Sequence, residues 1–159
     1  MRDILFRGKR TDNGEWVEGY YIHLHNTTYC LTTDNDADPS NDIHQIVFEH
    51  MTEWGLPNKH LRADVDPSTV GQYTGLNDKN GKRVFEGDIL RIAKKADNLG
   101  TYFFPPIEYP VLVFVKFDLC AWSWETISDD KYYIHFPEAW CDYECEVVGN
   151  LYDNPELLK

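Results

Sequence analysis

Long apolar runs are missing from this chain. No stretch of its 159 residues approaches the roughly twenty consecutive apolar residues that a membrane-spanning helix needs. The first ten residues hold an apolar run of only three residues, 4–6, which is too short for the core of a signal peptide. We therefore expect a cytoplasmic protein with no membrane partner.

Cysteine is scarce, and its spacing does not suit a metal site. Cys141 and Cys145 form a C-x-x-x-C pair, whereas Cys30 and Cys120 are isolated, so no second pair completes a zinc site. Thiols in the cytoplasm stay reduced. We interpret the four cysteines as small buried hydrophobic residues.

Basic residues are absent from the segment between Arg10 and Lys59, which holds nine acidic residues. The net charge of the chain is −12, and the bases concentrate in residues 79–95, where six bases face two acids. A protein that tracks a phosphate backbone needs a wide basic surface. The charge pattern therefore predicts no nucleic-acid partner. It favours a protein partner, including a second copy of this chain, and leaves open an acidic mimic of nucleic acid.

Phosphate and calcium motifs are missing or incomplete. Neither G-x-x-x-x-G-K-[ST] nor G-x-G-x-x-G occurs in the sequence. Asp34, Asp36 and Asp38 copy the first three ligand positions of a calcium-binding loop, but Pro39 stands where the loop needs Gly and Gln45 where it needs Glu. We interpret this segment as a solvated loop.

Two histidines, His23 and His25, share one face of an expected strand. Imidazoles so placed can bind a metal ion, but the sequence alone identifies no third ligand. Surface histidines without a ligand role are the favoured interpretation. We expect no metal site and no cofactor.

The residues that are present favour strands. Aromatic residues make up 14% of the chain, and short runs alternate apolar and polar side chains with a period of two. One turn of helix is expected at Asn154-Pro155-Glu156, and residues 51–66 are ambiguous, with a break at 55–58 and a helical turn considered after it. The expected strands are residues 4–8, 16–24, 27–32, 43–50, 70–75, 84–85, 89–92, 111–117, 120–127, 131–136 and 144–152.

The stretch from residue 71 to 90 is dense in turn residues. Asn80-Gly81 predicts a two-residue type I′ hairpin turn, with positive φ at Gly81 and at Asn80. Glu86-Gly87-Asp88 predicts a second turn before the next strand. This pattern is structural and indicates no phosphate cradle.

Candidate functional residues are few. The aromatic triplet of the long loop at residues 94–110 should pack or meet a partner, and Trp122 and Trp124 share one strand face, where they form core or, with Trp140, line a groove. Asp78, Glu86 and Asp88 are an alternative set of carboxylates for a hydrolase or a small-molecule site, although Asp78 also suits a turn. We assign no catalytic residue. The candidate interaction surface comprises Tyr73, Glu86, Asp88, Tyr102, Phe103, Phe104, Trp122 and Trp124.

Several motifs occur in order along the chain: ILFRGKR and GEWVEGY at residues 4–10 and 14–20, GQYTGL, DKNGK and FEGDI within 71–89, and VVGNLYDNPELL at 147–158. Together they resemble the YopX family of phage and prophage proteins.

The resemblance implies a phage-derived, all-β protein of short antiparallel strands with little helix. It implies one domain over residues 1–159, with an N-terminal β lobe over about 1–66 and an SH3-like barrel lobe over about 67–159. It supplies no activity. We expect a non-enzymatic protein–protein interaction or regulatory module that self-associates.

Overall fold

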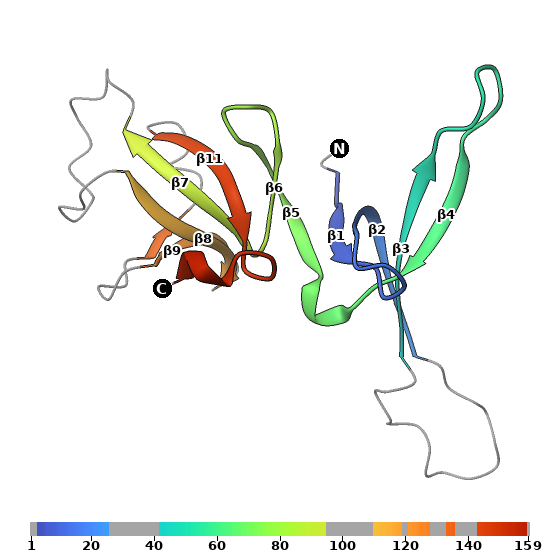
Figure 1. Ribbon diagram of the computed structural model, residues 1–159, viewed down its shortest axis with the longest axis horizontal. Helices are drawn as coiled ribbons and strands as arrows, with labels where there is room; N and C mark the ends of the chain where they lie inside the picture. The colour runs from blue at the N-terminus through green and yellow to red at the C-terminus, as the bar shows by residue number, and fades with distance from the viewer. Residues whose placement is uncertain are drawn as a thin grey trace, which may run out of the picture. The chain divides into compact units, whose positions relative to one another are not determined.

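The computed structural model describes residues 3–25, 42–94, 110–118, 121–127, 133–135 and 143–158, which form antiparallel strands and two short 3₁₀ helices (Figure 1). The chain divides into two compact units, Met1–Gln72 and Tyr73–Lys159. The sequence-based boundary lay about six residues earlier, at 66/67. Within the described residues, no helix is long and apolar enough to cross a membrane.

The first unit is an antiparallel sheet. Its hydrogen-bonded order is β4-β3-β2-β1, and the first residues of β5 pair with β1. Period-two alternation places Val17, Ile46, Ala63 and Val65 in its core. The strands are β1 (Phe6–Lys9), β2 (Trp16–Leu24), β3 (Ile43–His50), β4 (Lys59–Asp64) and β5 (Gly71–Asn77). A 3₁₀ turn, η2 (Pro67–Thr69), precedes β5, and Asp66 caps it by accepting a hydrogen bond from the Ser68 N–H.

Strand β4 corrects the prediction of a helical turn after residues 55–58. The sequence here alternates Leu61, Ala63 and Val65 with Arg62 and Asp64, but only Ala63 of the six side chains of β4 is buried. The strand exists because six successive residues pair with β3, from His50↔Lys59 to Gln45↔Asp64. Cross-strand pairing therefore decides what local propensity leaves open.

The second unit is a five-stranded antiparallel sheet in the order β10-β9-β8-β7-β11, and β6 pairs with the end of β5. The apolar strand β8 lies at the centre of this sheet. Buried side chains that include Leu90, Val113 and Trp124 form the core. The strands are β6 (Arg83–Phe85), β7 (Asp88–Lys94), β8 (Val111–Asp118), β9 (Ala121–Thr126), β10 (Tyr133–His135) and β11 (Tyr143–Asn150).

The all-β prediction is confirmed, but the SH3-like barrel is not. Among the residues that the structure describes, the outer strands β10 and β11 do not pair, so the sheet does not close into a barrel. The register between β11 and β7 shifts between Val147 and Gly149, so the ladder is irregular at this glycine. The expected turn of helix at Asn154 is the 3₁₀ helix η3 (Pro155–Leu158).

At the β5–β6 turn, the predicted positive φ of Gly81 is confirmed, but the predicted two-residue turn is wrong. Gly81 has φ of 81°, as expected. The turn, however, starts one residue earlier than a two-residue hairpin at Asn80-Gly81 would. The Gly81 N–H donates to the Asp78 carbonyl (3.0 Å), and the Asp78 N–H donates to the Lys82 carbonyl (2.8 Å). This is the three-residue loop that places Gly in the left-handed position.

Candidate functional site

Asp78 is a structural carboxylate. Its Oδ1 accepts hydrogen bonds from the backbone N–H groups of Asn80 (2.8 Å) and Lys82 (2.9 Å), and its Oδ2 accepts one from Val147 on β11 (3.1 Å). Burial raises the pKa of Asp78, but the hydrogen bonds from Val147, Lys82 and Asn80 lower it, and the pKa lies below its ordinary value. An ionised carboxylate that is committed to three backbone donors is poorly placed for acid–base chemistry.

Asp88 and Glu86 do not complete an acid–base pair with Asp78. Asp88 is 1% exposed, and its Oδ2 accepts a hydrogen bond from the Phe85 N–H at 2.8 Å. Glu86 is half-buried and approaches the Phe117 N–H on β8 at 3.5 Å, the outer limit of a hydrogen bond. The contacts of these side chains organise turns and strand ends, which is what the FEGDI motif does in this fold.

The two tryptophans of β9 differ. Trp124 is 1% exposed and belongs to the core, whereas Trp122 is partly buried and meets Phe117 edge to face, with ring centroids 5.0 Å apart. The prediction that Asp88 and Trp124 belong to the candidate interaction surface is therefore wrong, because side chains so deeply buried cannot contact a partner. Cys145 is buried, as interpreted from its sequence.

Other predicted residues remain on the surface or outside the description. Tyr73 is half-buried, packs against Phe85 with ring centroids 5.5 Å apart, and donates to Asn77 at 2.8 Å. The following predicted features lie outside the described residues: the aromatic triplet 102–104, Trp140, the acidic loop 34–38, the strand at 27–32, and Cys30, Cys120 and Cys141.

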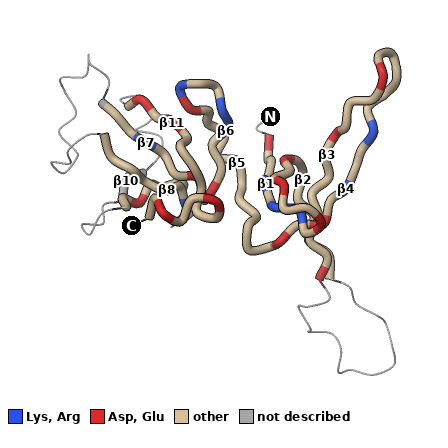
Figure 2. The backbone as a smooth tube through the Cα atoms, in the orientation of Figure 1, with Lys and Arg blue, Asp and Glu red and all other residues tan. Residues whose placement is uncertain are grey.

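The basic segment 79–95 is partly neutralised. Glu146 on β11 accepts both from Lys79, at 3.0 Å, and from Arg91, its cross-strand neighbour on β7. Figure 2 shows basic and acidic positions interspersed along this unit. The segment is therefore less basic than its sequence suggests.

A two-stranded projection of β3 and β4, residues 48–61, is here called the hairpin arm (Figure 1). The pairs between β2 and β3 end at Tyr20↔Val47, while those between β3 and β4 continue to His50↔Lys59. Beyond Val47 the arm is thus a lone hairpin. Its tip carries exposed apolar side chains: Met51 is 81% exposed, Leu56 is 60% exposed and Trp54 is fully exposed.

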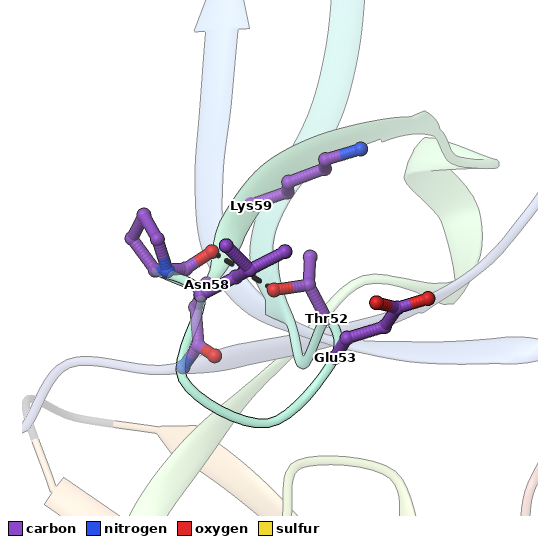
Figure 3. A pocket seen from close by; sticks show the side chains of 6 residues that line it. Thr52, Glu53, Asn58 and Lys59 are labelled. Atoms are coloured by element: carbon purple, nitrogen blue, oxygen red, sulfur yellow. Dashed lines mark hydrogen bonds between the residues drawn. The ribbon is translucent and has the colours of Figure 1, made fainter.

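The base of the tip is hollowed. A depression of about 490 Å³ lies among the residues of the loop, and its wall is fixed by a hydrogen bond from the Thr52 hydroxyl to the Pro57 carbonyl at 3.0 Å (Figure 3). Glu53 and Lys59 supply opposite charges on its rim. The arm therefore combines an exposed apolar tip with a shallow, mixed-polarity hollow.

An imidazole cluster lies on β2 and β3. His23 pairs directly with His44 across the strands, and their rings stack with centroids 4.5 Å apart at 17°. The Asp42 carboxylate is hydrogen-bonded to His23 Nε2 and to His25 Nδ1, each at 2.9 Å. The Tyr21 hydroxyl contacts His44 Nδ1 at 2.5 Å. Hydrogen bonds from His23 and His25 lower the pKa of Asp42.

Sequence reasoning missed the hairpin arm and half of this cluster. His23 and His25 were singled out by their two-residue spacing, but Asp42 and His44 are brought to them by the β2–β3 register. The histidines at positions 23 and 44 were visible in sequence, and aligning the two expected strands as a hairpin would have paired them. The exposure of Trp54 could not be predicted from the sequence, because it depends on where the pairing of β2 with β3 ends, at Val47.

Comparison with known proteins identifies a family and similar solved structures. The sequence model of a family described as YopX protein matches residues 5–159. The crystal structure of protein EF1440 from Enterococcus faecalis is similar in fold, with a TM-score of 0.53 and 24% sequence identity over 100% of both chains. No curated protein matches the chain. The likeness to EF1440 concerns the fold alone.

Proposed function

The chain belongs to the YopX protein family, and on that premise we propose that it is a non-enzymatic module that binds another protein. The observation that carries the proposal is the fully exposed Trp54 at the tip of the hairpin arm. An exposed indole flanked by Met51 and Leu56 is costly to leave in water and is typical of protein contacts, where Trp and Met are enriched.

The shape of the arm supports this proposal. A lone hairpin is only marginally stable in water, so an arm with an apolar tip gains stability when a partner covers it. Pairing of β3 with β4 at the root of the arm aligns the tip before binding, which lowers the entropy cost of association. Glu53 and Lys59 beside the hollow can position a partner through charge.

The alternatives have less support. A hydrolase or small-molecule site built on Asp78, Glu86 and Asp88 would need side chains that converge on a substrate, and Asp78 and Asp88 instead accept backbone hydrogen bonds. An acidic mimic of nucleic acid would need an unbroken acidic face, and several acidic side chains are paired with bases, as in Arg10–Asp12 and Lys116–Glu125.

The proposal extends to biological setting and assembly. The resemblance to a family of phage and prophage proteins supports a phage-derived gene and a regulatory role, and the uneven charge supports self-association in addition to a heterologous partner. The expected cytoplasmic location stays a prediction.

The experiment is a comparison of two exposed aromatic side chains in one capture assay. The wild-type chain, Trp54→Ser and Tyr20→Ser are used as baits in bacterial lysate, and the captured proteins are identified by mass spectrometry. Tyr20 is 60% exposed on β2, so its replacement is the matched control. We expect a protein that wild type and Tyr20→Ser retain and Trp54→Ser loses by about 10-fold or more, because hot-spot Trp residues contribute about 2 kcal/mol or more.

Binding of that protein is then measured with purified components. Equal capture by all three baits would contradict the role of the arm. A captured protein that is chemically altered by the chain would contradict the non-enzymatic part of the proposal.

A further inference from the structure

We propose that His23, Asp42 and His44 form a binding site for a divalent transition-metal ion, of which zinc is the expected occupant. The site is separate from the hairpin tip that carries the proposed protein contact. It needs only side chains of the β2–β3 pair and of the residue that precedes β3.

Geometry is the first argument. One ligand atom from each of the three residues lies within 4.8 Å of the other two. In a tetrahedral zinc site with bonds of about 2.0–2.1 Å, any two ligand atoms are about 3.3 Å apart. The hydrogen bond of 2.9 Å between His23 Nε2 and Asp42 Oδ2 must open slightly, and the remaining separations must close by about 1.5 Å or less, which side-chain rotation can supply.

The scaffold is the second argument. His23 and His44 occupy directly opposite positions in the antiparallel pair, and such positions hold their Cβ atoms about 4.5–5.5 Å apart. Their rings stack at 4.5 Å, so both imidazoles already lie on the same side of the sheet. Ligands on paired strands are held more precisely than ligands on loops.

The outer contacts are the third argument. A metal-binding imidazole is usually oriented by a hydrogen bond from its other nitrogen. His44 Nδ1 contacts the Tyr21 hydroxyl at 2.5 Å. When Nδ1 carries the proton of this hydrogen bond, Nε2 carries the lone pair that can bind a metal ion. His25 holds Asp42 from the far side, through Oδ1, while Oδ2 faces His23. Both the imidazole and the carboxylate therefore have orienting partners.

Donor chemistry selects the metal. Two imidazoles and one carboxylate suit zinc and its neighbours, whereas calcium and magnesium prefer six or more oxygen ligands. Three protein ligands leave a fourth position for water, as in zinc sites that are not fully closed. The expectation of no metal rested on the lack of a third ligand beside His23 and His25, and the strand register supplies Asp42 and His44.

The test uses the full chain with its thiols kept reduced. Zinc binding is measured by titration calorimetry, and cobalt is used as a probe because its visible spectrum reports coordination geometry. We expect one ion per chain and a tetrahedral cobalt spectrum without the near-ultraviolet bands of cobalt–thiolate bonds. His44→Gln, His23→Gln and Asp42→Asn should each weaken binding by more than about 100-fold, beyond the 10–100-fold typical of outer contacts.

His60→Gln is the matched control, because His60 is exposed on β4, where it lies 3.6 Å from Glu49. This variant should bind as wild type does. Circular dichroism of each variant shows whether the sheet is intact, and the two histidine variants lie on different strands, so a folding defect in one leaves the other informative. Absence of saturable binding, binding unchanged in His44→Gln and Asp42→Asn, or cobalt–thiolate bands would each overturn the site.

Discussion

At the scale of single residues, Gly81 shows how one backbone angle supports a motif. Its φ of 81° is a conformation that L side chains rarely adopt, and a Cβ added there would meet no atom within 4 Å. The cost of a substitution is therefore backbone strain and not crowding.

We expect Gly81→Val to lower the free energy of unfolding by about 1–3 kcal/mol, because a β-branched residue is strained at positive φ. Gly81→Asn should lose less, since Asn tolerates this region. Urea denaturation of the three proteins measures the difference. Equal midpoints for wild type and Gly81→Val would mean that the turn adopts another conformation in solution.

At the scale of elements, Asp78 joins the β5–β6 turn to β11. Its carboxylate holds the turn through Asn80 and Lys82 and holds the strand through Val147. The Lys79 N–H adds a second link by donating to the Cys145 carbonyl at 2.9 Å. Two motifs far apart in sequence are thus held together by the Asp78 carboxylate, the Lys79 peptide group and the Lys79–Glu146 ion pair.

The lowered pKa of Asp78 predicts a pH dependence of stability. The pKa of Asp78 in the folded chain lies below its unfolded value of about 3.9, so its stabilising contribution is present above about pH 3.9 and is lost as pH falls through the folded pKa. Asp78→Asn should lower the free energy of unfolding by about 1–3 kcal/mol at pH 7. The difference from wild type should shrink by pH 3.

Denaturant unfolding at both pH values tests this, with Asp12→Asn as control, because the exposed Asp12 forms a surface ion pair with Arg10, and such pairs contribute little to stability. A loss in Asp78→Asn that is the same at pH 3 and pH 7 would show that shape, and not charge, carries the contribution.

The sequence predicted most elements because local signals and packing agreed. Residues 16–24 and 43–50 were predicted as strands with the bounds that β2 and β3 have. β4 was left ambiguous because its alternation of Leu61, Ala63 and Val65 is short and follows directly on the break at residues 55–58. The barrel was wrongly expected to close because closure depends on pairing between the outer strands. The candidate surface failed at Trp124 and Asp88 for a similar reason, since burial is a property of the assembled sheet and not of residue type.

At the scale of the whole molecule, charge governs the expected partners. The net charge is −12, and two of the six bases in residues 79–95 contact Glu146. Tight binding of duplex DNA typically neutralises about six to ten phosphates. We expect no shift of random duplex DNA in a gel at physiological salt.

Self-association is expected to be partly electrostatic, between this basic segment and the acidic surface of a second copy. Sedimentation at low salt should show a larger species than at about 1 M salt, where the screening length falls to about 3 Å. Replacing Lys82 and Arg83 with Gln should reduce the larger species at low salt. A monomer at every salt concentration would remove this proposal, and a shifted DNA band would overturn the charge argument.

Strand β5 has a consequence for how such a gene can change. Tyr73 and Asn77 pair with β6, and the register shifts between them, where Gly75 has φ of 89°. L side chains rarely adopt this conformation. Amino-acid replacements at codon 75 are therefore expected to be tolerated less well than replacements at neighbouring exposed positions of the strand.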